Sequence, residues 1–414
     1  MIMKISTIVS AILVAASLML SCGSCSDEKQ ENNKPRTDIQ LTQSQQEIAQ
    51  NANKFAIDLF KATNDTAGNV AVSPYSIETS LAMLANGASG TTLSEILNVL
   101  HAEDSGVDGL NTFYQKVTTG LYDADNRVNL SIANALWAAK YIKMQDEYAA
   151  QMKNIFNAEV SSIDFTSSNA LKTINAWVGK ATGGKIGNLF EHLSPMTIMC
   201  VANVLSFEGK WTKEFEVKNT QQKTFKNWKG ENETIKQMIR DGAFSVAQIS
   251  DADVVELTYG NGAYVMDVIV PTNGSKINEW ISQLTYAKYN EMVSKLGSEQ
   301  GVKLFLPKFV AKSKSDLIPI LKQLGLNHLF NKTDLSGITE TPMSITQYVH
   351  QMNVTVDESG TKVESATGAV GGYTSFLSDS KEFIVDSPFI YMVRERSTGA
   401  ILLIGKVQTM AGMQ

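Results

Sequence analysis

The chain has 414 residues, of which 43% are apolar and 19% charged, with 28 Gly and 8 Pro. This composition excludes a disordered, fibrous or low-complexity protein and allows a large buried core. The 36 basic residues are outnumbered by 42 acidic ones, giving a net charge of −6, and they are scattered along the chain, so we expect no DNA or RNA partner.

The N-terminal residues have the pattern of a secretory signal peptide. Lys4 precedes an apolar run, Ile8 to Leu20, that is too short to span a bilayer comfortably. The run closes on Leu20-Ser21-Cys22, which resembles a bacterial lipobox, in which signal cleavage leaves an N-terminal cysteine to be lipidated. We therefore expect residues 1–21 to be a signal peptide and Cys22 to be the lipid anchor of a secreted bacterial outer-membrane lipoprotein.

The other cysteines give no sign of a metal or disulfide site. Cys22 and Cys25 have a spacing that also occurs in redox and zinc centres, but such centres need a folded frame and further ligands, and only Cys200 remains. Cys200 lies inside the apolar run Ile198 to Leu205, so we expect it to be a buried small side chain. The sequence therefore predicts neither a metal nor a cofactor.

Residues 22–44 have the composition of a tether, because the stretch from Gly23 to Gln43 is polar and shows no apolar period. Its acidic residues just after Cys22 resemble the signals that send lipoproteins of some Gram-negative bacteria to the outer cell surface. Acidic linkers are also common solvated spacers, so this signal is not specific.

The first half of the folded part is expected to be mainly helical. An apolar stripe with helical spacing runs from Ile48 to Phe60, and Ser73-Pro74 provides a capping serine and a first-turn proline for a second helix. Thr92-Leu93-Ser94-Glu95 has the form of a capping box that opens a third helix. Two further stripes run from Tyr148 to Phe156 and from Leu171 to Val178.

Strand patterns dominate the later part of the chain. Their members alternate in polarity or form short continuous apolar runs, and they lie at Val128–Ile132, Ile198–Phe207, Tyr264–Val270, Val302–Leu306, Tyr348–Asp357, Phe389–Val393 and Ala400–Val407. In the segment before Asp357, His350, Met352 and Val354 are expected on one face of the strand. No repeat and no second linker is visible, so we predict one mixed α+β domain over residues 45–411.

Enzyme signatures are missing from the sequence. There is no Gly-x-Ser-x-Gly elbow and no His-Glu-x-x-His helix, and the four histidines are far apart along the chain. The segment Gly179 to Lys185 approaches a phosphate-binding loop, but Ile186 replaces the hydroxyl residue that would hold magnesium. We interpret this segment as a glycine-rich end of a helix and expect the protein not to be an enzyme.

The segment from Glu358 to Ser387 is a long stretch of small, polar and β-branched residues before the last hairpin, and compact domains seldom carry such loops without a use. If its first part became a strand, Thr361, Val363 and other small residues would face one side, and Lys362 and Glu364 would face the other. The segment therefore has the chemistry to enter a sheet by strand addition.

Six motifs occur along the chain in the order of one known family. They are Asn69 to Ile77, Asn203 to Trp211 with Phe215 and Thr220 after it, Leu306-Pro307-Lys308, Asp334-Leu335-Ser336-Gly337, Glu358 to Thr367, and Asp386-Ser387-Pro388-Phe389. Through these motifs the chain resembles the serpin family from about Ile48 to Val407. The resemblance implies a single α+β domain in which helices pack on a large mixed central sheet beside smaller sheets, with an exposed reactive loop.

The resemblance implies a protease inhibitor that acts as a suicide substrate. A protease cuts the exposed loop, over about residues 361–380, and the acyl-enzyme is trapped as the loop inserts into the central sheet. The implied partner is a serine protease, with cysteine proteases as a further class, and we expect a monomer. A non-inhibitory serpin that acts as a binding module and is cleaved as a plain substrate is the alternative.

Two residue sets correspond to family positions that control opening of the sheet. The polar cluster beneath the sheet comprises Ser73, Ser76, Asn203 and His350. The ion pair at the end where insertion begins comprises Lys308 and Glu358, with Trp211 and Thr220 nearby. As a rim pair it is expected to contribute about 1 kcal/mol to stability, so its value would lie in gating.

The reactive bond follows from the loop length. Counting from Glu358 places it between Thr374 and Ser375, and counting back from Pro388 moves it toward Leu377, with Tyr373 and Phe376 as further candidates. This part of the loop has no Arg or Lys, so elastase-like or chymotrypsin-like enzymes fit better than trypsin-like ones.

The hinge departs from the family pattern, because Lys362 stands where an acidic residue is usual and Val363 and Glu364 stand where alanines are usual. Both charges can remain on the outer face after insertion, so a working inhibitor is favoured. The residues assigned to the hinge are Gly360, Thr361, Lys362, Val363, Glu364, Ser365, Ala366 and Thr367.

Overall fold

The computed structural model describes residues 34–65, 67–362 and 381–413, which belong to one compact unit that begins at Lys34. The expected signal peptide, the anchor Cys22 and most of the expected reactive loop lie outside the described residues. None of the helices in the described ranges is long and apolar enough to cross a membrane.

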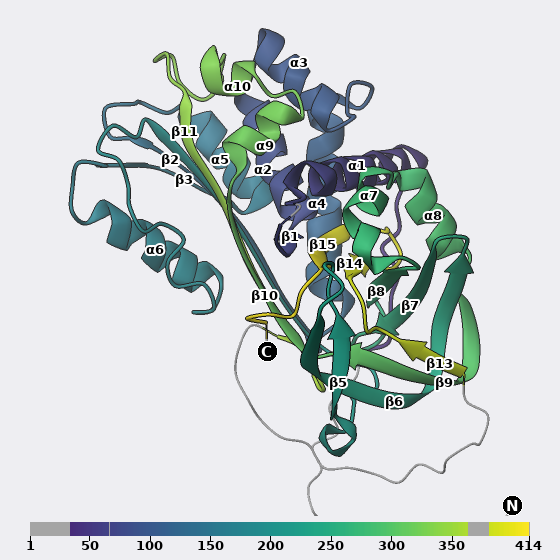
Figure 1. The fold of residues 1–414 in the computed structure, drawn as a ribbon. Helices are drawn as coiled ribbons and strands as arrows, with labels where there is room; N and C mark the ends of the chain where they lie inside the picture. The colour runs from purple at the N-terminus through teal and green to yellow at the C-terminus, as the bar shows by residue number, and fades with distance from the viewer. Residues whose placement is uncertain (1–33, 66, 363–380, 414) are drawn as a thin grey trace, which may run out of the picture. The chain divides into compact units, whose positions relative to one another are not determined.

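Most of the helices lie together on one side of the central sheet (Figure 1). The helices are α1 (Gln43–Thr63), α2 (Pro74–Gly87), α3 (Gly90–Val99), α4 (Gly106–Ala124), α5 (Asp146–Phe156), α6 (Ala170–Ala181), α7 (Ile277–Ser282), α8 (Tyr286–Ser294), α9 (Leu317–Gln323) and α10 (His328–Asn331), with short 3-10 turns at Val217–Asn219 and Gly274–Lys276. Helix α6 is set apart from the others on the opposite face of the β2–β4 sheet (Figure 1).

The strands form two sheets. They are β1 (Val70–Val72), β2 (Val128–Ala139), β3 (Glu159–Ile163), β4 (Met199–Lys210), β5 (Gln221–Lys226), β6 (Asn232–Ile249), β7 (Ala252–Thr258), β8 (Tyr264–Pro271), β9 (Gly297–Pro307), β10 (Phe309–Asp316), β11 (Ile345–Asp357), β12 (Gly360–Lys362), β13 (Lys381–Ile384), β14 (Phe389–Glu395) and β15 (Ile401–Val407). One sheet has the order β10-β11-β12-β4-β2-β3, and we call it the central sheet. The other has nine strands in the order β1-β15-β14-β8-β7-β6-β9-β13, with β5 paired to β6.

The central sheet is mixed, because β11 pairs with β4 and β2 with β3 in parallel, while β2 pairs with β4 and β10 with β11 in antiparallel fashion. Its long strands are covered on both faces, which explains the nearly continuous burial of β4. Together with the surrounding helices, this sheet confirms the α+β architecture predicted from the sequence.

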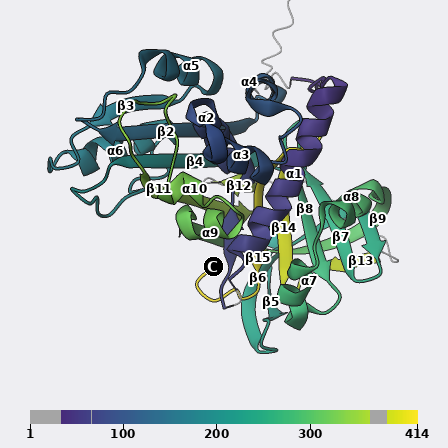
Figure 2. The same cartoon turned by 90° about the horizontal axis from the view of Figure 1, so that it is seen from above.

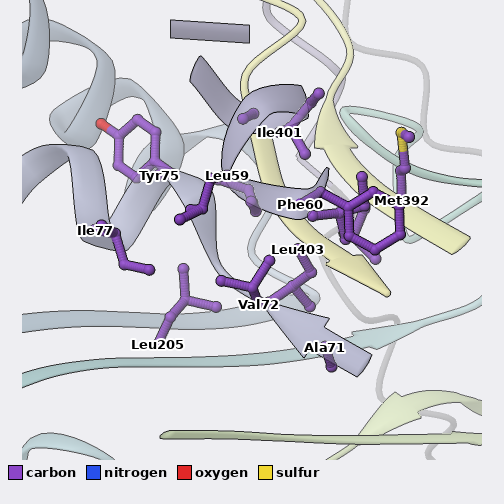
Figure 3. Close-up of a cluster of buried hydrophobic side chains, with 14 of the residues drawn as sticks. Leu59, Phe60, Ala71, Val72, Tyr75, Ile77, Leu205, Met392, Ile401 and Leu403 are labelled. Carbon is purple, nitrogen blue, oxygen red and sulfur yellow. The ribbon is translucent and has the colours of Figure 1, made fainter. Parts of the chain in front are cut away.

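The main core lies between the helices and the two sheets. Figure 3 shows Leu59 and Phe60 of α1 near Val72 of β1, with Ile77 and Leu205 beside them and Leu403 of β15 behind. Seen from above, α1 crosses over β14 and β15 (Figure 2). A second, smaller core joins Ile174 and Val178 of α6 to the other face of β2 and β4, where Cys200 is fully buried as expected.

The predicted elements are present, but two start signals differ from the prediction. Ser73 is at the N-cap position of α2 with Pro74 after it, yet its hydroxyl makes no capping hydrogen bond in the described structure. Thr92 does not cap a helix: α3 begins at Gly90 after Ser89, and Thr92 lies buried within it. Its hydroxyl instead accepts a hydrogen bond from the backbone N–H of Asp334 at 2.9 Å. A tertiary contact has therefore taken the hydroxyl that a capping box would have used.

The prediction of a loop from Glu358 to Ser387 is also wrong near both ends, where the structure describes strands. Gly360–Lys362 forms β12 in the central sheet, and Lys381–Ile384 forms β13, which pairs in parallel with β9 in the other sheet. The small and β-branched residues that suggested a loop are compatible with strands, and pairing partners decide the outcome.

Candidate functional site

The site is built around the turn from β11 into β12, which brings the chain back into its own sheet. Asp357 organises this turn, since its Oδ1 accepts hydrogen bonds from the N–H of Ser359 at 2.9 Å, the hydroxyl of Ser359 at 2.6 Å and the N–H of Gly360 at 3.2 Å. An aspartate that binds the backbone two and three residues ahead is a standard way to fix a tight turn.

Strand β12 lies between β11 and β4 and runs antiparallel to both. Thr361 pairs with Val356 of β11 and with Gly209 of β4. A side chain at Gly360 would bring its Cβ to 2.0 Å from the carbonyl oxygen of Gly209, so only glycine fits. The close approach of two backbones at this position thus depends on the absence of a side chain.

Aromatic side chains receive the inward-facing Thr361. Its hydroxyl is 2.6 Å from the hydroxyl of Tyr259, and both residues are fully buried. The ring of Tyr259 stacks on Trp211 with centroids 4.5 Å apart and planes at 14°. The indole N–H of Trp211 donates to the backbone oxygen of Asp357 at 2.9 Å, and its backbone N–H donates to that of Ser359 at 2.9 Å. These contacts bind both ends of the turn.

The predicted ion pair is present beside this turn. The Nζ of Lys308 is 2.8 Å from Oε2 of Glu358, and the hydroxyl of Thr220 donates to Oε1 at 2.8 Å. Burial alone would raise the pKa of Glu358, but the hydrogen bonds from Lys308, the backbone and Thr220 outweigh it and hold the pKa below its usual value. The side chain of Glu358 is only 10% exposed, so the pair is less open to solvent than the rim pair expected from the sequence.

The predicted polar cluster also comes together, under the centre of the sheet. The side chain of Asn203 is its hub: its Oδ1 accepts from the hydroxyl of Ser76 at 2.7 Å and lies 3.0 Å from Nδ1 of His350. The backbone N–H of Ser73 donates to Nε2 of His350 at 3.1 Å. Burial lowers the pKa of His350 to about 4, which keeps the ring neutral at neutral pH.

Sequence reasoning missed several members of this cluster and of the turn. Asn134 accepts from Asn203 at 2.6 Å and donates to Thr79 at 3.1 Å, and Tyr348 is hydrogen-bonded to Ser80. The polar position of Asn134 inside an apolar strand was a usable signal. No comparable sequence signal pointed to Tyr259, because the residues next to it in the sequence do not indicate that it faces the hinge.

The pairing of β4 and β11 is interrupted below β12. The parallel ladder ends at Gln351 and Val204, and β12 reaches only Thr355 on β11 and Gly209 on β4. Among the described residues, neither 352–354 of β11 nor 205–208 of β4 has a partner across this interval, which we call the unpaired interval. The hydroxyl of Ser206 and Oε1 of Gln351 are buried there without a hydrogen-bond partner in the described structure. Within the described residues, the facing edges of β11 and β4 therefore lack a strand partner over this interval.

The remaining predicted residues lie outside the described ranges. These are the reactive-bond candidates Tyr373, Thr374, Ser375, Phe376 and Leu377, the anchor Cys22, and the hinge residues Val363, Glu364, Ser365, Ala366 and Thr367; of Lys362 the structure describes the backbone only. Within the described ranges, no three His, Cys, Asp or Glu side chains gather in a way that would hold a metal ion.

Comparison with known proteins shows which family and which relatives this chain is similar to. A family model described as "Serpin (serine protease inhibitor)" matches residues 50–410. The leukocyte elastase inhibitor of Bos taurus is 32% identical over 371 residues, covering 86% of this chain and 97% of the relative. An uncharacterized serpin-like protein of the archaeon Methanosarcina mazei is 29% identical over 373 residues, 87% of each chain.

Solved structures agree with the sequence relatives. Native protease nexin-1 with heparin superposes with a TM-score of 0.79 at 25% identity, covering 88% of this chain and 100% of the other. Human thyroxine-binding globulin gives a TM-score of 0.81 at 25% identity, covering 89% and 99%. The likeness thus spans nearly the whole of these structures.

Proposed function

Because the chain belongs to the serpin family, whose members generally inhibit proteases as suicide substrates, we propose that it inhibits a protease in this way and is not itself an enzyme. The nucleophile of the protease attacks a carbonyl carbon in the loop, the C–N bond breaks, and the new amine takes a proton and leaves. The acyl bond to the protease survives because the cut loop enters the central sheet before water can hydrolyse it.

The observation that carries this proposal is the position of β12 between β11 and β4. Thr361 is already paired to both strands, and the unpaired interval lies directly ahead of it. Continuing the same strand would place Val363, Ser365 and Thr367 on the buried face, as the sequence pattern predicts. Only Val363 among these is bulky. In the same register, Thr367 would lie between His350 and Asn203, so insertion that far must separate the paired part of β11 and β4.

We propose an elastase-like or chymotrypsin-like serine protease as the target and the bond between Thr374 and Ser375 as the site of attack. The segment 363–380 has no Lys or Arg, so a specificity pocket with a buried acid would find no anchor. The likeness to the leukocyte elastase inhibitor of Bos taurus supports the same choice. Tyr373, Phe376 and Leu377 are the neighbouring candidates for the cleaved side chain.

We further propose that the protein acts as a monomeric bacterial lipoprotein, held at the outer membrane through Cys22 and exposed at the cell surface. The apolar run followed by Leu20-Ser21-Cys22 and the polar, acidic segment after it support this placement. An inhibitor tethered there would meet proteases from the surroundings of the cell.

The non-inhibitory alternative rests on one feature, the hinge. Lys362, Val363 and Glu364 depart from the small residues usual in inhibitory members, and slow insertion would let the acyl-enzyme hydrolyse. The protein would then be cut without trapping the protease.

The experiment that tests the proposal is incubation with elastase and with chymotrypsin, followed by denaturing gels and mass analysis of the released C-terminal fragment. We expect a covalent band at the summed mass of the protease and the cleaved inhibitor, and a fragment that begins at Ser375. A different fragment start would move the reactive bond but keep the mechanism. Complete cleavage without a covalent band, for both enzymes, would instead support the non-inhibitory alternative.

A further inference from the structure

The segment 34–41, which we call the N-terminal arm, packs against the folded body and does not hang free. Ile39 and Leu41 pack against the main core, and the N–H of Ile39 donates to the hydroxyl of Ser397 at 2.9 Å. Helix α4 makes room for Ile39 with a glycine, since a Cβ on Gly120 would come within 2.7 Å of the Ile39 side chain. The arm therefore has a seat that is shaped for it, and the compact unit starts well before the expected domain boundary at residue 45.

The start of the arm is held by the turn between β7 and β8. The side-chain N–H of Asn261 donates to the backbone oxygen of Lys34 at 3.1 Å and to that of Ala124 at 2.8 Å. The ammonium group of Lys34 also donates to the backbone oxygen of Asp123. One asparagine thus joins the arm, the end of α4 and the β7–β8 turn.

The same turn touches the hinge from its other side. Tyr259, two residues before Asn261, is the residue that binds Thr361 and stacks on Trp211. Gly260 sits between them with φ near +47° and donates its N–H to the backbone oxygen of Lys210 at 2.8 Å. It could not carry a Cβ, which would meet the Asp125 carboxylate at 1.8 Å. This short turn has little freedom of its own, so a displacement at Asn261 is transmitted to Tyr259.

We propose that the N-terminal arm, gripped by Asn261, positions Tyr259 and thereby seats β12 in the central sheet, so that release of the arm lowers the efficiency of trapping. Asn261 is a positioning residue in this scheme, because it acts through Tyr259 and does not touch the loop in the described structure. The inference rests on the proposed inhibitory function. It also connects the trap to the C-terminal part of the expected tether, residues 22–44, because the arm lies within that segment and packs on the folded body.

The test uses the full-length chain purified in detergent and a variant in which Ile39→Ser and Leu41→Ser unseat the arm. We expect the number of inhibitor molecules consumed per protease trapped to rise about fivefold, the size expected for the loss of one hydrogen-bonded contact at the hinge. Arg36→Ala is the matched control: it lies on the same arm, pairs with Asp38 near the surface, and should leave this number unchanged.

A second variant, Asn261→Ala, separates coupling from simple loss of stability. If the arm acts through Asn261, adding Asn261→Ala to the arm variant should give no further loss beyond the larger single effect. Fully additive effects, or an unchanged stoichiometry in the arm variant, would overturn the proposal.

Hydrogen exchange keeps the inference testable even if the proposed function fails. In the arm variant, exchange should accelerate both in the turn 258–263 and in β12, without any protease present. Acceleration confined to the arm itself would disprove the coupling. If the parent chain never forms a covalent complex but the arm variant still exchanges faster in both 258–263 and β12, the inhibitory function is refuted and the coupling is supported.

Discussion

The side chain of Glu358 is largely buried, and its carboxylate binds Lys308 and Thr220. The backbone oxygen of Glu358 accepts a hydrogen bond from the N–H of Phe215 at 2.8 Å. Removing its charge leaves the ammonium of Lys308 facing a neutral amide. We expect Glu358→Gln to lower the free energy of unfolding by about 2 kcal/mol, as for other hydrogen bonds to charged groups. Urea-induced unfolding followed by tryptophan fluorescence measures this value.

The control for this substitution is Glu279→Gln, which breaks an ion pair to Lys276 whose side chains are 61% and 67% exposed. Exposed pairs of this kind contribute less than about 0.5 kcal/mol. Equal losses for the two variants would show that the position of Glu358 beside the hinge has no special value.

Protonation of His350 should weaken the native sheet in acid. Burial lowers the pKa of His350 to about 4, below the value near 6.5 of an exposed histidine, so the unfolded state takes up the proton first as the pH falls. The contribution of neutral His350 to the free energy of unfolding is therefore complete above pH 6.5. About 3 kcal/mol of it is lost as the pH falls from 6.5 to 4. Protonation of Nε2 would also remove the acceptor of the Ser73 N–H.

Urea unfolding at pH 7 and pH 4.5 checks this dependence. We expect His350→Gln to flatten it relative to the parent, whereas His101→Gln, at a half-exposed histidine beside Asp58, should leave it unchanged. Identical pH dependence in the parent and in His350→Gln would contradict the assignment.

The side chain at the cleaved bond should select the protease. Thr374→Arg introduces the side chain that trypsin-like pockets bind, and we expect the variant to form a covalent complex with trypsin that the parent does not form. Ser378→Arg is the control, because it adds the same charge to the same loop at a different position. Trapping of trypsin by Ser378→Arg and not by Thr374→Arg would move the reactive bond toward the C-terminal end of the loop.

At the scale of elements, the seat of β12 depends on a glycine. The Cβ of Gly360→Ala would press against the carbonyl oxygen of Gly209, which cannot move without breaking the pairing of β4. We expect β12 to leave the sheet, with hydrogen exchange in 359–361 about tenfold faster, and more loop cleaved per protease trapped. Gly297→Ala on β9, where an added Cβ meets nothing within 4 Å, is the matched control. Unchanged exchange in Gly360→Ala would show that β12 is not held by this close approach.

The sequence predicts a helix or strand correctly where a local pattern, such as alternation, decides its structure. Alternation placed His350, Met352 and Val354 on the buried face of β11, and their burial confirms it. The rule fails where a distant partner decides: Thr92 was taken from its capping role by Asp334, and Gly360–Lys362 became a strand because β4 and β11 part to receive it. Strand β6 was not predicted, since its buried and exposed residues do not alternate regularly along its length.

The site follows the same division. The positions of Lys308 and Glu358, and of Asn203 and His350, could be predicted from the resemblance, and the structure brings each pair together. Tyr259 and Asn261 could not, because their importance arises only from what lies on either side of one turn.

At the scale of the whole molecule, the segment 363–380 connects two different sheets. Its N-terminal end continues from β12 in the central sheet, and its C-terminal end leads into β13 beside β9. Cleavage would free the first end from the second and allow β12 to lengthen into the unpaired interval. In the proposed mechanism, β12 is the start of the entering strand and the unpaired interval is where this strand begins to lengthen.

The most direct test of the proposed mechanism compares hydrogen exchange in 205–208 of β4 and 352–354 of β11 before and after the loop is cut. We predict that cleavage strongly slows exchange of the amides that face the unpaired interval, because the inserted strand gives them hydrogen-bond partners. Unchanged exchange in both segments after complete cleavage would contradict insertion and with it the inhibitory mechanism.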